Sequence, residues 1–134
     1  MKKSLSALIL SITLAANLVL AIPTSSAAVK NSLTITYQET PESKVQKWSL
    51  KCQPTAGTMK NAKGVCKLLT AMSNPFMKPD PAEMCAAIFE SAEVATVKGT
   101  WKGKKVSARF AKNNSCEISR WKTLNFLLQG SKTA

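Results

Sequence analysis

Four cysteines constrain the fold of this chain more than any other feature of its sequence: Cys52, Cys66, Cys85 and Cys116. They are spaced too widely for a CxxC redox or metal-binding motif. An even number of cysteines in a short chain is typical of exported domains that add disulfides to a modest core. Three pairings are open to four cysteines, and we expect the local one, Cys52 with Cys66 and Cys85 with Cys116. Each disulfide would contribute about 3–4 kcal/mol by the chain-entropy estimate.

The N-terminal segment has the pattern of a secretion signal. Lys2 and Lys3 form a basic start, residues 5–22 are almost entirely apolar, and residues 26–28 are small. A membrane anchor is the alternative, because the apolar stretch is long. The small residues and the lack of a basic stop-transfer run favour cleavage after residue 28. We therefore expect a secreted, extracellular protein, free of the membrane after cleavage, with one domain over residues 29–134.

Composition narrows the classes of function. Of the 19 basic residues, 17 remain once Lys2 and Lys3 are removed, and against 7 acidic residues they give a net charge of +10. This charge favours anionic partners, although solubility alone would also explain it. The chain has no histidine, which excludes Ser-His-Asp and Cys-His catalysis and most zinc sites. No glycine-rich phosphate loop occurs either, so we expect no enzyme activity, no metal and no cofactor.

Hydrophobic periodicity predicts strands and one main helix. Strict alternation over Ser32 to Tyr37 and over Val45 to Cys52 indicates half-buried strands. The segment Gln53 to Gly57 is expected to be a loop. Apolar residues at helical spacing predict a helix from about Asn61 to Met72. Thr123 to Leu128 alternates again, which predicts a last strand.

A hairpin is the clearest local structure in the sequence. Val94 to Trp101 and Lys104 to Phe110 flank Lys102-Gly103, a two-residue turn. In this register Val97 lies opposite Ala108, and one face of the hairpin is nearly all apolar while the other is polar. Such a sheet covers a helix with its apolar face. We therefore expect an α+β two-layer sandwich of about five antiparallel strands and one main helix, with two disulfides.

The apolar run Met84 to Phe89 surrounds the third cysteine. Charged or turn-forming residues bracket it, from Lys78-Pro79-Asp80-Pro81 to Glu90-Ser91. A core strand is one interpretation, but the run does not alternate and has no clear turn toward the hairpin. An exposed, covalently anchored strip that another protein grips is the other interpretation. The nearby carboxylates, Asp80, Glu83, Glu90 and Glu93, offer an acid–base pair only if a cleft holds them.

Several segments carry a family resemblance when they are taken in order. They are Leu50-Lys51-Cys52-Gln53-Pro54, Met84-Cys85, Gly99-Thr100-Trp101-Lys102-Gly103-Lys104-Lys105-Val106 and Asn114-Ser115-Cys116. With the cysteine spacing, this set resembles the Streptomyces subtilisin inhibitor family of secreted serine-protease inhibitors. The resemblance spans nearly the whole of residues 29–134. It implies an inhibitor that offers a loop to the protease as a substrate would.

The resemblance also implies roles for individual residues. The loop that contacts the protease would comprise Met84, Cys85, Ala86, Ala87, Ile88 and Phe89. The reactive bond would be Ala87–Ile88, two residues after the loop cysteine, with Ala87 in the primary specificity pocket. Asn114 would brace the loop backbone, although a simple turn residue is an equal interpretation. Because alanine is small and neutral, the expected partner is a subtilisin-like serine protease.

One departure from the family pattern affects this placement. The stretch from Cys85 to Trp101 is one residue longer than the family pattern, and we place the insertion after Phe89. An earlier insertion would move the reactive bond to Ala86–Ala87 or to Ile88–Phe89.

Two further partners are considered: a second copy of the chain, which the family resemblance implies, and an anionic polymer, which belongs to an alternative function. The family implies a two-fold homodimer through the sheet. The alternative function is a basic cell-envelope or polyanion-binding module on the same fold, without inhibitory activity and without specific nucleic-acid binding. Basic residues gather on the hairpin near Trp101, which would then stack on the ligand: Lys98, Lys102, Lys104, Lys105, Arg109 and Lys112.

Overall fold

A computed structural model describes residues 31–130 of the chain. The predicted signal over residues 1–28 lies outside the described residues, so it stays a prediction. The described part is a five-stranded antiparallel sheet in the order β3-β2-β1-β4-β5, with two helices. The elements are β1 (Ser32–Gln38), β2 (Gln46–Lys51), β3 (Ala56–Gly57), α1 (Ala62–Ala71), β4 (Ser91–Trp101), β5 (Lys104–Lys112) and α2 (Ser115–Leu128).

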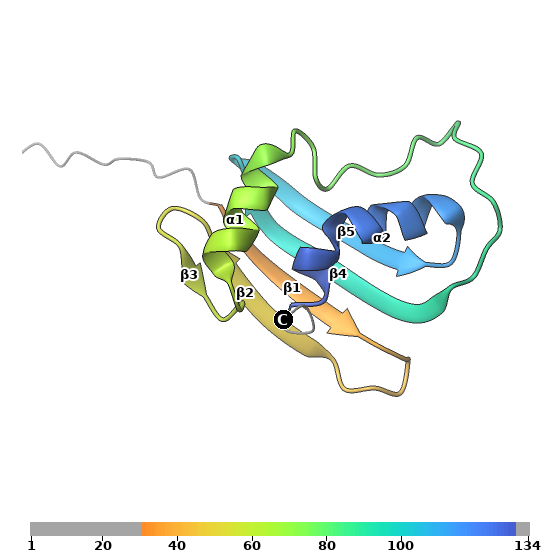
Figure 1. Ribbon diagram of the computed structural model, residues 1–134, viewed down its shortest axis with the longest axis horizontal. Helices are drawn as coiled ribbons and strands as arrows, with labels where there is room; N and C mark the ends of the chain where they lie inside the picture. Colours follow the sequence, from red (N-terminus) through yellow and green to blue (C-terminus); the bar gives the residue numbers. More distant parts are fainter. Residues whose placement is uncertain (1–30, 131–134) are drawn as a thin grey trace, which may run out of the picture.

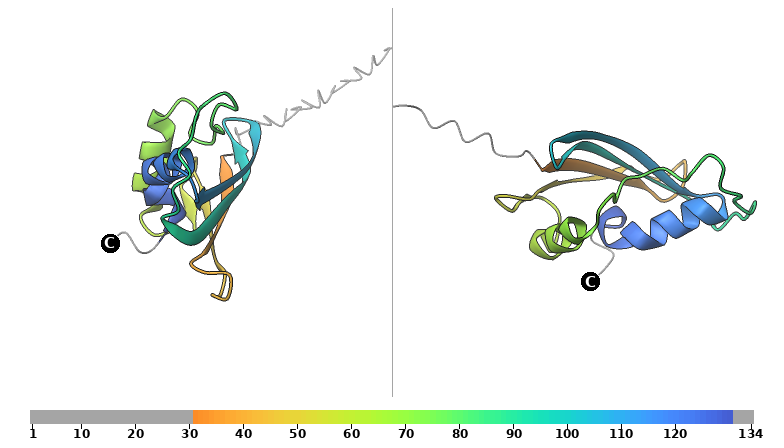
Figure 2. Two further views of the ribbon diagram at one scale, coloured as in Figure 1. Left: turned by 90° about the vertical axis from the view of Figure 1, so that its right-hand side faces the viewer. Right: turned by 90° about the horizontal axis from the view of Figure 1, so that it is seen from above.

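Both helices cover the same face of the sheet, which gives two layers (Figures 1 and 2). The expected α+β sandwich with two disulfides is therefore confirmed. β1 is the central strand and pairs with β2 on one side and β4 on the other. Its apolar residues Leu33, Ile35 and Tyr37 are buried, as the alternating pattern predicts. Within residues 31–130, neither helix combines the length and the apolar character that crossing a membrane requires.

The β4–β5 hairpin has the predicted register. Val97 lies opposite Ala108, and the pairing runs on to the turn at Lys102 and Gly103. Both turn residues have positive φ, 47° and 75°, which is the requirement of the two-residue turn whose twist matches the strands. Gly99 approaches β1 so closely that an added Cβ would collide with the carbonyl oxygen of Ser32. The glycine of the Gly-x-Trp pattern is thus needed for sheet packing.

The predicted last strand, Thr123 to Leu128, is wrong, because these residues belong to helix α2. Leu124, Phe126 and Leu128 alternate over six residues, but the longer series fits a helix. The residues of α2 that are buried are Cys116, Ile118, Trp121, Leu124, Leu127 and Leu128. From Ile118 to Leu127 they recur every three residues, which places one apolar stripe on the core. There are two helices in the described chain rather than one main helix.

The fifth strand is instead β3, which lies in the segment expected to be a loop. Its two residues pair with the end of β2, where Leu50 lies opposite Gly57. The predicted helix over Asn61 to Met72 is confirmed as α1, which buries Val65 and Leu69.

The core lies between the sheet and the two helices. Trp121 of α2, Tyr37 of β1 and Phe110 of β5 are its largest fully buried side chains. The rings of Tyr37 and Trp121 lie 6.3 Å apart between centroids. Aromatic side chains of this size supply much of the apolar area that a domain of one hundred residues can bury.

Candidate functional site

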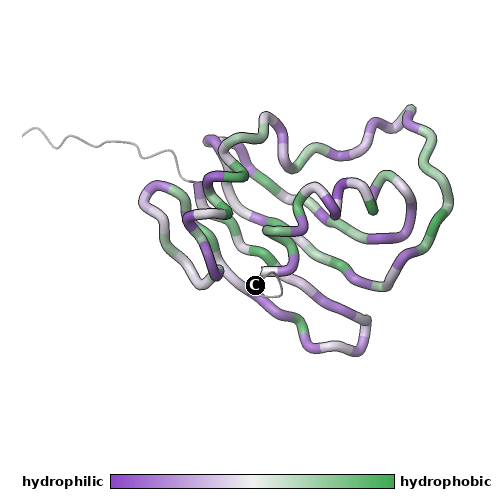
Figure 3. The backbone as a smooth tube through the Cα atoms, in the orientation of Figure 1, coloured by the Kyte–Doolittle hydropathy of each residue, from purple (hydrophilic) through white to green (hydrophobic). Residues whose placement is uncertain are grey.

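The apolar run Met84–Phe89 lies outside the core, on the segment that connects α1 to β4. Met84 is 97% exposed, Phe89 is 70% exposed and Ile88 is 52% exposed. Ala86 and Ala87 are exposed as well. The run forms an apolar outer edge of the molecule in Figure 3. The interpretation as a core strand is therefore excluded, and the interpretation as an exposed strip holds.

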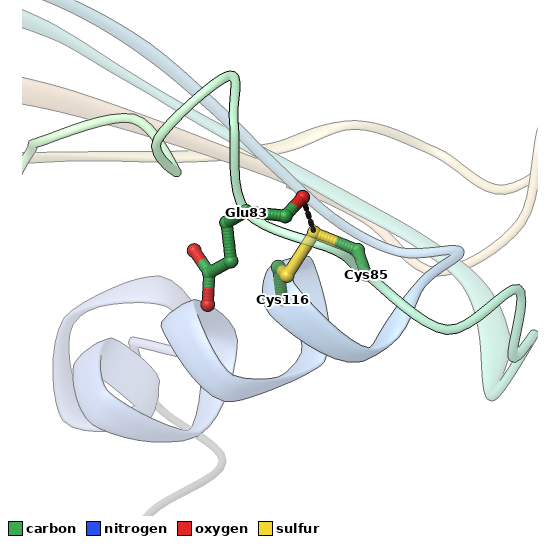
Figure 4. A group of neighbouring side chains, drawn as sticks. All are labelled: Glu83, Cys85 and Cys116. Atoms are coloured by element: carbon green, nitrogen blue, oxygen red, sulfur yellow. Dashed lines mark hydrogen bonds between the residues drawn. A yellow bond between two sulfur atoms is a disulfide. The ribbon is translucent and has the colours of Figure 1, made fainter.

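A disulfide anchors this strip to α2 (Figure 4). Cys85 is bonded to Cys116, in the first turn of the helix, with an S–S distance of 2.00 Å. The other disulfide joins Cys52 to Cys66 and connects the end of β2 to α1. Both predicted pairings are confirmed, and none of the four cysteines is free.

The carboxylate of Glu83 lies near this disulfide, and the three side chains come within 4.8 Å of one another. Both sulfur atoms are in the S–S bond, so the group has no thiolate to offer a metal ion. The carbonyl oxygen of Glu83 lies 3.7 Å from Sγ of Cys85. This contact is not an S–H hydrogen bond, because a disulfide sulfur carries no hydrogen. The group is therefore a covalent anchor of the strip.

Ser115 holds the backbone of Ala86 from both sides. The N–H of Ala86 donates to Oγ of Ser115 over 2.8 Å, and the N–H of Ser115 donates to the carbonyl of Ala86 over 3.0 Å. The N–H of Ile88 donates to the same carbonyl over 2.9 Å, which closes a tight turn around Ala87. The loop is thus fixed by hydrogen bonds as well as by the disulfide.

Asn114, predicted to brace the loop, begins α2. Its side chain accepts a hydrogen bond from the N–H of Glu117 over 2.9 Å, as the N-cap residue of the helix. In the described chain it has no direct bond to Met84–Phe89. The direct contact comes from the next residue, Ser115, for which the sequence analysis assigned no role. Because Cys116 is bonded to the loop cysteine, its neighbour in the chain is a reasonable candidate for a hydrogen bond to the loop backbone.

The other end of the strip is attached to β5 at Lys112. The N–H of Glu90 donates to the carbonyl of Lys112 over 2.8 Å. Nζ of Lys112 lies 2.7 Å from the carboxylate of Glu93 and 3.3 Å from that of Glu90. The same ammonium group lies 5.0 Å from the ring centroid of Trp121. Lys112 therefore connects the returning loop to the core.

Glu93 is the centre of this polar cluster. It accepts a hydrogen bond from the hydroxyl of Tyr37 over 2.6 Å and one from Ser91 over 2.8 Å, besides that of Lys112. Burial alone would raise the pKa of Glu93, but hydrogen bonds from Lys112, Tyr37 and Ser91 outweigh burial and lower that pKa to about 2. Burial and the adjacent carboxylate raise the pKa of Tyr37 above its usual value.

The pKa of Lys112 is raised as well. Burial opposes the charged form, but hydrogen bonds to Glu93 and Glu90 outweigh it. Lys112 and Glu93 are thus a charged pair at neutral pH. Glu90 and Glu93, two of the four carboxylates that the sequence offered for acid–base chemistry, hold the end of the loop through Lys112.

An exposed strip held at both ends on an α+β sandwich is the geometry of a loop that another protein can contact. A family model described as subtilisin inhibitor-like matches residues 26–114 of this chain. The chain therefore belongs to the subtilisin inhibitor-like family, and it is an inhibitor of subtilisin-like serine proteases. The match ends at Asn114, so Cys116 and all of α2 lie beyond it.

One solved structure with a similar chain is that of Streptomyces caespitosus sermetstatin in complex with Bacillus licheniformis subtilisin. The two chains share 22% identity, the alignment covers 70% of this chain and 91% of sermetstatin, and the TM-score is 0.43. The family assignment rests on the sequence match, because this structural similarity is low. No curated protein matches the chain in sequence.

Proposed function

We propose that Met84–Phe89 is the reactive loop and that Ala87–Ile88 is the bond offered to the protease. The observation that carries this proposal is the attachment of the backbone on both sides of that bond. On the acyl side, Cys85 is bonded to Cys116 and Ala86 is held by Ser115. On the leaving-group side, the N–H of Glu90 donates a hydrogen bond to the carbonyl of Lys112 in β5.

This attachment explains how a substrate-like loop inhibits. The serine of the protease would attack the carbonyl of Ala87, and both new chain ends would stay near their original positions. The bond can then re-form before the leaving end departs. A loop that is already ordered also loses little conformational entropy on docking, which raises affinity.

The carbonyl groups of the loop support this choice over the bond Ala86–Ala87. The carbonyl of Ala86 already accepts two N–H groups, so it could enter an oxyanion hole only by breaking them. The carbonyl of Ala87 has no hydrogen bond within the described chain. The bond Ile88–Phe89 would place a β-branched residue in the specificity pocket, whereas Ala87 lies two residues after the loop cysteine, as the resemblance implies.

An irregularity in β4 supports the same choice. Ser91 lies opposite Lys112, and Val94 lies opposite Ala111, so β4 holds two extra residues where β5 has none. A bulge of this kind absorbs an inserted residue without changing the rest of the ladder. It lies after Phe89, where we placed the insertion, and an insertion there leaves the spacing from Cys85 to Ala87 unchanged.

The expected site of action is outside the cell, since the N-terminal pattern is that of a secretion signal. The expected targets are proteases with a small or apolar primary pocket. Trypsin-like enzymes, whose pocket carries an aspartate, should bind poorly to an alanine.

A titration of subtilisin with the purified protein tests the function, and a charge substitution tests the bond. We expect loss of subtilisin activity at a 1:1 ratio. Ala87→Lys should gain trypsin inhibition at least tenfold over the parent, because the new ammonium group reaches the acidic pocket. The matched control, Ile88→Lys, should not. A gain with Ile88→Lys alone would move the reactive bond to Ile88–Phe89, and no gain with either would refute both of these placements of the bond.

A further inference from the structure

The face of the sheet opposite the helices carries hydroxyl groups and positive charges. We call it the open face; no described helix covers it (Figure 2). Its cations are Lys47, Lys51, Lys98, Lys105 and Arg109. Its hydroxyl residues are Ser32, Thr34, Thr36, Ser49, Thr96, Thr100 and Ser107. These residues alternate with the core residues of β1, β2, β4 and β5, so they point away from the core.

No acidic residue lies on the open face. All seven in the sequence lie elsewhere: Glu39, Glu42, Asp80, Glu83, Glu90, Glu93 and Glu117. The five cations are exposed, and none takes part in an ion pair of the described chain, where Lys112 and Arg120 form the ion pairs. Solvated surfaces usually mix charges of both signs. A face with one sign only produces a field that attracts anions.

The charges follow the register of the hairpin. Three successive cross-strand pairs each join one hydroxyl to one cation, namely Thr100 with Lys105, Ser107 with Lys98, and Thr96 with Arg109. Same-face residues along a strand are separated by about 6.5–7 Å. Each step of that length along the hairpin therefore presents one cation. A second, shorter track runs along β2 with Lys47 and Lys51.

This spacing fits a phosphodiester polymer with three carbons between phosphates. Six extended bonds of about 1.5 Å separate its phosphorus atoms by roughly 7 Å. One phosphate can thus meet one cation in each row, while a hydroxyl of the row donates to a second oxygen. The hydroxyls of Thr36 and Thr96 bond to one another, and that pair keeps one hydrogen to donate.

Other occupants fit the open face less well. The face has no aromatic residue to stack on nucleobases. Trp101, which we expected to stack on a polyanion, is only 5% exposed and points into the core. By the register the apolar members of the open face are Val94 and Ala111, at one end of the hairpin; Val94 is half-buried and Ala111 is buried, so neither is free to enter a bilayer. A two-fold dimer through this face would oppose two sets of five cations, which is unfavourable at close range.

We propose that the open face binds a linear phosphodiester polymer without bases, such as poly(glycerol phosphate). The reactive loop is attached to α2 through Cys116, in the other layer of the sandwich. Binding therefore leaves the loop exposed, and the polymer holds the inhibitor where its target protease acts.

The test is the binding of fluorescently labelled poly(glycerol phosphate), measured by anisotropy from 20 to 200 mM NaCl. With three phosphates neutralised, the logarithm of the association constant should fall against log[salt] with a slope of about −2 or steeper. The variant Lys98→Gln/Lys105→Gln/Arg109→Gln should bind at least tenfold more weakly at the lowest salt concentration. Its slope should be shallower by about 2.

The matched control is Lys60→Gln/Lys63→Gln/Lys67→Gln. It removes the same charge from exposed positions in and next to α1, on the other layer. Its affinity should stay within about twofold of the parent protein. Both variants should still inhibit subtilisin at the parent's ratio, which shows that they are folded.

Four results would overturn the proposal. The first is that the parent protein does not bind the polymer. The second is that both variants lose affinity equally, which would mean that net charge alone is responsible. The third is that single-stranded DNA or vesicles of anionic lipid bind more tightly than the polymer. The fourth is that sedimentation shows a dimer of the parent protein and that the open-face variant is monomeric, which would mean that a second copy covers the face.

Discussion

Removal of the disulfide Cys85–Cys116 should convert the inhibitor into a substrate. The chain-entropy estimate for a separation of 31 residues gives a loss of about 4 kcal/mol in the free energy of unfolding. The second effect is local. Without the bond, the acyl side of Ala87–Ile88 is held only by the two hydrogen bonds between Ala86 and Ser115. Each is worth about 1 kcal/mol, so the cut ends separate more readily than they rejoin.

The second disulfide supplies a matched control. Cys52 and Cys66 are separated by 14 residues, so their removal costs about 3 kcal/mol. That bond joins β2 to α1 and does not touch the loop. The variants Cys85→Ser/Cys116→Ser and Cys52→Ser/Cys66→Ser thus lose similar stability, but only the first loses the attachment next to the proposed reactive bond.

The assay is incubation with a substoichiometric amount of subtilisin, followed by mass spectrometry and by recovery of protease activity. Unfolding in urea identifies conditions in which both variants are folded. We expect the Cys85/Cys116 variant to be cut at Ala87–Ile88 and activity to return, while the Cys52/Cys66 variant still inhibits. Equal cleavage of both variants would mean that global stability protects the loop. An uncut Cys85/Cys116 variant would refute the argument that the disulfide retains the chain end.

Two smaller perturbations test the remaining supports of the loop. Ser115→Ala removes the acceptor for the N–H of Ala86 and should weaken subtilisin inhibition about 5–10-fold, which is the effect of one hydrogen bond. The control Ser115→Thr keeps the hydroxyl group. An equal loss of inhibition with threonine would argue against this role of Ser115. The pKa of Glu93 is lowered from 4.5 to about 2. The ionised carboxylate therefore stabilises the folded protein in full above pH 4.5, and this contribution to the free energy of unfolding, on the order of 2 kcal/mol, is lost as the pH falls toward 2. In urea unfolding at pH 6 and pH 3, Glu93→Gln should therefore lose less stability than the parent protein, and equal losses would contradict the charged pair with Lys112.

The sequence predicted the elements whose signals are local. The hairpin register follows from a two-residue turn between two long alternating strands, so the pairing of Val97 with Ala108 needed no tertiary information. β3 has no such signal, because two residues form a strand only when the end of β2 lies beside them. The last segment was assigned to the wrong element because a six-residue window at Leu124 to Leu128 fits a strand, whereas Ile118 and Trp121 extend the helical series.

The site was predictable to the same extent. The apolar run around Cys85 left a core strand and an exposed strip open, and the family resemblance favoured the exposed strip; the disulfide was the one expected among three possible pairings. The contributions of Ser115 and Lys112 depend on backbone groups that approach one another only in the folded chain. The sequence left Glu93 as a candidate for acid–base chemistry. A carboxylate near a loop can serve catalysis or hold the loop in place, and only its partners in the folded chain decide between the two. Its partners, Tyr37 and Lys112, lie on two other strands.

The C-terminal helix connects the loop to the core of the protein. Both loop anchors, Ser115 and Cys116, lie in the first turn of α2, so any tilt of the helix would move the bond that we propose as reactive. Trp121 prevents such a tilt, because its side chain is fully buried. Arg120 adds a second attachment: its guanidinium group lies 4.4 Å from the ring centroid of Phe110 and binds the carboxylate of Glu117. The fixed geometry of Ala87–Ile88 thus depends on packing one to two turns along the helix.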